Sequence, residues 1–310
     1  MTVRPFGYYY VMRCSGASAA AASLLVLWAA GSARAWSFDV HRFITDRAID
    51  LLPSEIRPFY QSSRAFIVEH SIDPDLWRSA GWAEEPPRHF LDLDAYGAPP
   101  FRELPREYDR AVARFGRETL DKNGTVPWRA ERVFADLVKA FEQHAAGTGF
   151  ALENVRFFSA VLAHYVADAH VPFHAVIDYD GQRTNQRGIH ARFEGELFDR
   201  YRKRLHFAWS PASPRRDARD LVFDALATGF DDVPTLLAAD RAAIEGRDAY
   251  DARYYDTFFA AARPILERRM ARASTAIASL LAGAWEQAGR PRLVGRPALA
   301  RPAPPSREPQ

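Results

Sequence analysis

The chain has 310 residues, of which 48% are hydrophobic and 26% are charged, values that are ordinary for a globular protein. Its formal net charge of +2 arises at the two ends: residues 1–35 carry three arginines and no acidic residue, and residues 289–310 carry five arginines and one glutamate. The body between them carries about −5, which counts against tight binding of nucleic acid through a generally basic surface.

Residues 1–35 have the pattern of a secretory signal. Arg4 and Arg13 lie near the start, and an apolar run follows at Ala19–Ala30. Ala33-Arg34-Ala35 is a small-x-small cleavage site. The apolar run is too short for a membrane-spanning helix. We therefore expect an exported protein, periplasmic or secreted, that begins at Trp36. Its only cysteine, Cys14, would be removed with the signal, so the mature chain would have no disulfide.

Helical periodicity dominates the rest of the chain up to Ala288, and no sustained strand alternation or internal repeat is present. The segment from Val155 to Asp168 is apolar almost all round, which is typical of a central helix. We therefore predict a single all-α domain over residues 36–288, built around this buried helix. The other predicted helices are His41–Leu52, Trp128–His144, Ala191–Leu205, Arg216–Thr228 and Tyr250–Trp285, the last of them broken at Pro264.

Three segments are predicted to lack regular structure. Ser71–Pro105 and Val176–Gly188 are rich in turn-forming and polar residues, and loops of this kind often line active sites. Residues 289–310 consist mainly of proline, arginine and alanine, which predicts a disordered tail.

Two histidine–carboxylate pairs occur at helical spacing, His164-x-x-x-Asp168 and His190-x-x-x-Glu194. Residues four apart on a helix share one face, so both side chains of a pair can reach the same ion. His174 lies between the pairs, just beyond Pro172. Taken singly, such a histidine is more often a hydrogen-bonded core residue or a surface residue. Their succession instead favours a site for zinc, which accepts imidazole nitrogen and carboxylate oxygen.

Cleavage after Ala35 would create a further ligand. The free α-amine and the carbonyl oxygen of Trp36 could chelate one metal ion once the amine is deprotonated, and His41 follows five residues later. His89 stands in the segment Pro87–Phe90. His70, His144, His170 and His206 have no partner at a metal-binding spacing.

The order of these residues resembles the trinuclear zinc signature of bacterial zinc-dependent phospholipases C and fungal single-strand-specific nucleases. The similarity extends from Trp36 to Tyr201, and His164–Asp168 with Pro172–Ala175 is especially similar to the phospholipase pattern. The resemblance implies an all-α fold, three zinc ions and hydrolysis of a phosphodiester.

The resemblance also implies how the ligands are shared among the three ions. Asp75 is chosen over Asp73 as the ligand because of its Pro-Asp context and its distance from His89. By resemblance, Asp75 could act as general base or serve as a ligand only. The implied ligand sets are Asp75, His89, His164 and Asp168 for one ion; His174, His190 and Glu194 for the second; and Trp36, His41 and a bridging Asp168 for the third.

Phospholipase and nuclease are both left open by the sequence. Glu194 and the absence of cysteine from the mature chain are phospholipase-like, whereas the short spacing from Trp36 to His41 is nuclease-like. Leu76 and Pro86 stand where phospholipases have residues that recognise the headgroup. A third possibility is a periplasmic zinc-binding protein without turnover.

The expected partners follow from these alternatives. We expect a phospholipid or a nucleic-acid phosphodiester as substrate, transient contact with a membrane surface, and no obligate protein partner. Four aromatic residues could stack on a base or touch a lipid chain, although packing in the core is the commoner role of such side chains. They are Trp77, Trp82, Phe90 and Tyr96.

Overall fold

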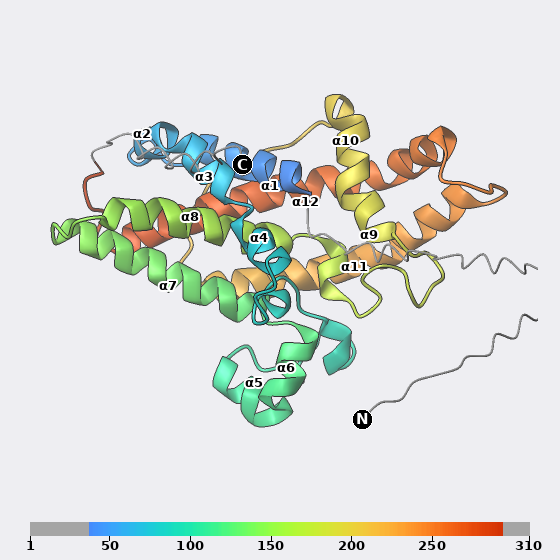
Figure 1. Ribbon diagram of the computed structural model, residues 1–310, viewed down its shortest axis with the longest axis horizontal. Coiled ribbons are helices and arrows are strands. Elements are labelled where there is room, and N and C mark those ends of the chain that lie inside the picture. Colours follow the sequence, from blue (N-terminus) through green and yellow to red (C-terminus); the bar gives the residue numbers. More distant parts are fainter. Residues whose placement is uncertain (1–36, 294–310) are drawn as a thin grey trace, which may run out of the picture. The chain divides into compact units, whose positions relative to one another are not determined.

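The computed structural model describes residues 37–293, and every regular element within that range is helical (Figure 1). The predicted all-α fold is therefore confirmed for this part of the chain. The predictions on the signal, on Trp36 and on most of the tail fall on residues 1–36 and 294–310, which lie outside the described residues. Between residues 37 and 293, none of the helices combines the length and apolar character needed to cross a bilayer.

The longest helices of the described chain form two consecutive pairs, α7 with α8 and α11 with α12. The α-helices are α1 (Phe38–Asp50), α2 (Arg57–Ser62), α3 (Arg64–His70), α4 (Asp73–Ser79), α5 (Tyr108–Phe115), α6 (Arg117–Asn123), α7 (Val126–Ala145), α8 (Ala151–Asp168), α9 (Ile189–Ala191), α10 (Leu197–Tyr201), α11 (Ala218–Ile244) and α12 (Ala252–Gln287). Single turns of 3₁₀-helix are η1 (Pro86–Arg88), η2 (Leu93–Tyr96), η3 (Pro172–Ala175) and η5 (Arg202–Arg204), and η4 (Arg192–Glu196) is a π-helical turn.

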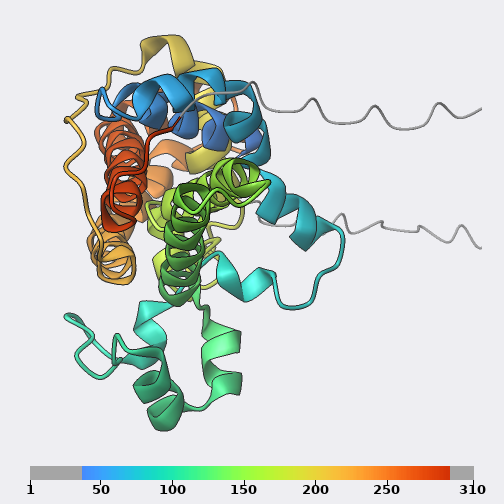
Figure 2. The ribbon, with the colours of Figure 1, turned by 90° about the vertical axis from the view of Figure 1, so that its left-hand side faces the viewer.

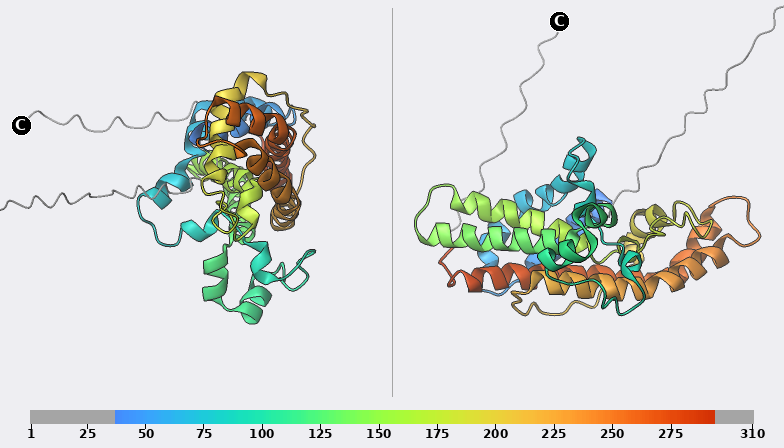
Figure 3. Two further views of the ribbon diagram at one scale, coloured as in Figure 1. Left: turned by 90° about the vertical axis from the view of Figure 1, so that its right-hand side faces the viewer. Right: turned by 90° about the horizontal axis from the view of Figure 1, so that it is seen from below.

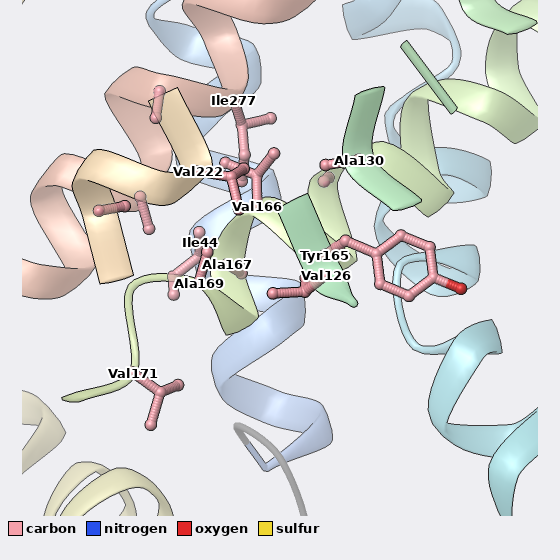
Figure 4. Close-up of a cluster of buried hydrophobic side chains, with 14 of the residues drawn as sticks. Ile44, Val126, Ala130, Tyr165, Val166, Ala167, Ala169, Val171, Val222 and Ile277 are labelled. Carbon is pink, nitrogen blue, oxygen red and sulfur yellow. The ribbon is translucent and has the colours of Figure 1, made fainter. Parts of the chain in front are cut away.

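Helix α8 is the central element, as predicted. It packs against α1, α3, α7 and α12, and its residues from Ser159 to Asp168 are all buried. Figure 4 shows Val166 and Ala167 of α8 among side chains from neighbouring helices, including Ile44 of α1 and Ile277 of α12. Because this shell is apolar and closely packed, the polar residues on the same helix are held at fixed positions in the interior.

The end of α8 is set by Pro172. The residue before a proline avoids the helical conformation, and Val171 is accordingly extended, with φ −76° and ψ 119°. The chain then turns through η3, which packs on α11. This turn brings His174 back towards the last turn of α8.

Helices α11 and α12 run side by side, and α11 is longer than predicted (Figure 3). The expected break at Pro264 is wrong, because α12 continues through it. Pro264 and Ala260, one turn earlier, are both exposed, so water can satisfy the carbonyl that loses its hydrogen bond. Helix α11 likewise runs past Thr228 and through Pro234 to Ile244.

Two further segments differ from expectation. Ser71–Pro105 is not irregular throughout, since it contains α4, η1 and η2. Asp73-Pro74-Asp75 forms the first turn of α4, a position that favours proline because its missing N–H has no partner there. The single helix predicted at Ala191–Leu205 is instead divided among α9, η4, α10 and η5.

Helices α5 and α6 form a small hairpin to one side of the long helices (Figure 2). Helix α6 contacts η1, and the backbone N–H of Asp92 donates to the carbonyl of Asn123 at the end of α6 (2.8 Å). The hairpin therefore borders the segment that carries His89.

Candidate metal centre

The last two turns of α8 carry the first histidine–carboxylate pair. His164 and Asp168 are both fully buried, and His164 Nε2 lies 3.2 Å from Asp168 Oδ2. His164 Nδ1 is 2.8 Å from the carbonyl of Ser71, to which it donates. This bond orients the ring so that Nε2 faces Asp168, as a metal ligand requires.

Two more imidazoles approach Asp168 from other elements. His41 of α1 places Nε2 3.3 Å from Asp168 Oδ1, and His89, which follows η1, places Nδ1 2.9 Å from Oδ2. Burial alone would raise the pKa of Asp168, but His164, His41 and His89 outweigh it and hold the pKa well below its usual range. Asp168 is therefore a carboxylate with three imidazoles around it.

Asp75 joins the same group. It is buried on α4, and one of its oxygens lies close to ligand nitrogens of both His41 and His164. Asp73 instead pairs with His70, whose Nδ1 is 2.7 Å from Asp73 Oδ2. Of the two aspartates weighed from the sequence, the structure therefore brings Asp75 to the cluster.

His174, His190 and Glu194 form a second group of buried donors. His174 Nδ1 is 2.8 Å from the carbonyl of His89, to which it donates, and His190 Nε2 lies 3.0 Å from Glu194 Oε2. Burial lowers the pKa of His174 to about 3 and that of His190 to about 4, so both imidazoles are neutral at pH 7. Burial, reinforced by Asp168, raises the pKa of Glu194 well above its usual range.

Two of the close contacts, His41–Asp168 and His190–Glu194, are not ordinary hydrogen bonds. His41 Nε2, Asp168 Oδ1, His190 Nε2 and Glu194 Oε2 are buried, yet none makes a hydrogen bond of normal geometry. Two ligands of a tetrahedral ion with bonds of about 2.0–2.1 Å lie roughly 3.3 Å apart, which is close to the separations observed here. Donor atoms that face a shared point at this spacing fit a metal ion.

Three sets of donors, the first two of which share His164, could thus hold metal ions: His41, Asp75 and His164; His89, His164 and Asp168; and His174, His190 and Glu194. The last set is the one that the family resemblance implied. His89, His164 and Asp168 also belong to one predicted set, whereas the set with His41 differs from the prediction because His41 approaches Asp75 and His164 as well as Asp168. Eight of the nine predicted ligands are brought together, and the ninth, Trp36, lies outside the described residues.

The described chain begins beside the set formed by His174, His190 and Glu194. A Cβ placed on Gly195 would lie 3.4 Å from Ser37 Cβ, an ordinary van der Waals distance, so Ser37 lies next to the turn that carries Glu194.

A cavity of about 330 Å³ opens onto the ligands. Asp92 lines it as well, and burial, together with the nearby Asp94, raises the pKa of Asp92 to about 7. Two cations also face the space. The full lining is Arg78, Pro86, His89, Phe90, Asp92, Lys122, Phe173, His174, Tyr179 and His190.

Glu85, which lies behind His89, was not predicted from the sequence. Glu85 is fully buried, with Oε1 3.6 Å from His89 Nε2. It also accepts a hydrogen bond from the hydroxyl of Tyr165 and pairs with Arg88 (2.8 Å). Carboxylates in this position orient metal-binding histidines. The spacing Glu85-x-x-x-His89 is the same as in the two predicted pairs and could have revealed it.

Arg78 was missed as well. It stands three residues after Asp75 on α4, and its Nη2 lies 2.8 Å from Asp75 Oδ1. It therefore links a ligand of the first set to the cavity wall.

The remaining histidines stay outside the cluster, as expected. His170 is the only buried one among His70, His144, His170 and His206, and its Nδ1 donates to the carbonyl of Val166 (2.8 Å). Burial lowers the pKa of His170 to about 4.

Comparison with known proteins does not place the chain in a family. No protein-family model matches it, and no curated protein matches it either.

Replacing His164 by alanine should remove metal and stability together, because this residue belongs to two of the three donor sets. We expect the loss of about two bound ions and a fall of about 4 kcal/mol in the unfolding free energy with metal present. Metal analysis and denaturation with and without a chelator measure both. His206→Ala, at an exposed histidine, should change neither, and full metal loading of His164→Ala would contradict the assignment.

His170 should make the protein less stable in mild acid. The unfolded imidazole binds a proton near pH 6.5, whereas the folded one does so only near pH 4. The unfolding free energy should therefore fall as the pH drops from 6.5 towards 4, by up to about 1.4 kcal/mol per pH unit from this group. His170→Asn keeps a donor for Val166 but does not titrate, so its chelated form should show a shallower pH dependence than the chelated wild type. Equal slopes in denaturation curves would contradict this.

Proposed function

We propose that this protein is an exported, zinc-dependent phosphodiesterase of the phospholipase C-like type. The proposal rests on one observation: side chains from six separate parts of the chain converge in three buried donor sets, two of which share His164. Imidazole and carboxylate donors suit zinc better than harder cations. The cavity beside His89, His174 and His190 gives a substrate access to these ligands.

The residues around the cavity suit a phosphodiester. Bound zinc ions would supply charge stabilisation for the phosphate and lower the pKa of the attacking water. Arg78 would contact a non-bridging phosphate oxygen while its ion pair keeps Asp75 in place. Asp75 has a second carboxylate oxygen that could accept the proton of the attacking water.

Exposed apolar side chains on and just after α4 support a phospholipid substrate. Trp82, 54% exposed, stacks on Trp77, with ring centroids 5.6 Å apart, and Leu76 is 40% exposed on the same helix as Asp75. Tryptophan prefers the interface between lipid and water. A membrane surface held there would lie beside the ligand-bearing face of α4.

Other residues of the cavity favour a nucleic acid as the second candidate substrate. Tyr179 is 46% exposed and its ring lies 6.4 Å from that of His190. Together with Phe90 it could stack on a base, and Lys122 could pair with a further phosphate. A zinc-binding role without turnover is less well supported, since three of the ligand residues face a cavity instead of being enclosed.

Activity assays on the mature protein test the proposal and separate the substrates. Phosphatidylcholine vesicles, single-stranded DNA and single-stranded RNA should be offered to zinc-loaded and chelated protein. We expect hydrolysis of the lipid, lost on chelation and restored by zinc, and a decrease of about 100-fold or more for Asp75→Asn. Cleavage of nucleic acid alone would favour the second candidate.

Two further outcomes of these assays bear on the lipid surface and on turnover. Trp82→Ala should slow hydrolysis of vesicles but not of a soluble short-chain phospholipid. No hydrolysis of any substrate by fully zinc-loaded protein would overturn the enzymatic proposal.

The amino terminus can be tested separately. If the Trp36 amine binds metal, one extra residue before it should reduce the zinc content by about one ion and remove most activity. Metal analysis of the mature and extended proteins measures this. Adding a residue after Gln310 instead is the matched control, and an unchanged zinc content in the amino-terminally extended protein would contradict the proposed ligand.

A further inference from the structure

Between His190 and Glu194 lies a third buried residue that does not face the metal centre. Arg192 is 4% exposed, and its guanidinium meets Asp240 of α11, which is fully buried. Arg192 Nη2 and Nε donate to Asp240 Oδ1 at 3.0 and 3.3 Å. Arg192 thus lies between the two metal-binding residues on one short segment and pairs with a residue of another helix.

The same arginine also holds the loop before the site. Arg192 Nη1 donates to the carbonyl of Arg187 (2.8 Å), and Nη2 donates to the carbonyl of Gln186 (3.2 Å). The Gln186 amide in turn donates to Asp240 Oδ2 (2.7 Å). The loop, the π-helical turn and α11 are therefore joined through one carboxylate.

Helix α12 completes this arrangement. The Tyr254 hydroxyl donates to Asp240 Oδ1 and accepts from Arg192 Nε (2.9 Å). The ring of Tyr250 lies 4.0 Å from the guanidinium carbon of Arg192. Asp240 thus receives hydrogen bonds on both oxygens, which compensates the cost of burying its charge.

The backbone around His190 and Glu194 explains why such support is needed. Arg192–Glu196 form a π-helical turn, which is a rare departure from regular helix and is found mostly at functional sites. In an α-helix the backbone itself would fix the spacing of residues four apart. Here His190 belongs to α9 and Glu194 to the π-helical turn, so the separation of 3.0 Å between their side chains spans a change in helical geometry.

We propose that the Arg192–Asp240 pair is a positioning device for the metal set formed by His174, His190 and Glu194. The pair carries no net charge and touches no ligand atom, so it acts by holding the π-helical turn. Breaking it weakens binding of one ion while leaving the sets around Asp168 intact. This inference rests on the metal-binding part of the proposed function and not on the substrate.

The test compares metal affinities of the mature protein and its variants, measured by chelator competition with zinc and by cobalt spectroscopy. Asp240→Asn should weaken one ion by roughly 10- to 100-fold, as expected when a residue that supports a ligand is altered, and should change the cobalt absorption of that ion alone. Tyr254→Phe, a milder change that leaves the pair in place, should have a smaller effect on the same ion.

Asp232→Asn is the matched control. Asp232 pairs with the buried Arg269 (2.7 Å) and also joins α11 to α12, and its ion-pair partners Arg268 and Arg269 are not metal ligands. It should lower the unfolding temperature and leave every metal affinity unchanged.

Three outcomes would overturn the inference. One is wild-type affinity for all ions in both Asp240→Asn and Tyr254→Phe. Another is the same selective loss in Asp232→Asn, which would reduce the pair to a general contribution to stability. The third is a wild-type protein that binds no zinc, which would refute the metal centre itself. Zinc binding without hydrolysis would count only against the proposed enzymatic activity.

Discussion

The carboxylate of Asp168 is the group around which the described structure is arranged. It is fully buried, and a buried carboxylate without compensation would be strongly unfavourable. Three imidazoles from α1, α8 and the segment after η1 surround it, and His174 Nδ1 lies 3.9 Å from it on the side of the second set. The helix that carries Asp168 must therefore lie at the centre, because only there can several elements reach the same group.

A second layer fixes the orientation of the ligands. The carbonyls of Ser71 and His89 accept from Nδ1 of His164 and His174, and each bond directs the opposite nitrogen towards the donor set. Glu85 lies behind His89, with Oε1 3.6 Å from Nε2. These contacts come from irregular or 3₁₀ backbone around the long helices, whose packed core supplies the rigid frame. Stability and site geometry are thus provided by different parts of the chain.

The sequence pattern was sufficient to predict those features that depend on residues close together in the chain. The central helix, its pair His164–Asp168 and the pair His190–Glu194 follow from periodicity and from the four-residue interval. How the donor residues divide among the three sets could not be predicted, because the approach of His41 to Asp75 depends on how α1 and α4 pack. Pro264 was misjudged because the cost of a proline depends on solvent exposure, which sequence does not reveal. Arg192 gave no signal, as its partner Asp240 is distant in the chain.

The ligand sets also connect parts of the chain that are far apart in sequence. An ion held by His41 and His164 would close a loop of roughly 120 residues, and a permanent link of that size lowers the entropy of the unfolded chain by the equivalent of about 5 kcal/mol. No cysteine occurs after residue 14, so covalent bridges cannot supply such links in the helical domain. Metal coordination would take over the part that disulfides have in many other proteins, with the difference that it is reversible and depends on the metal supply.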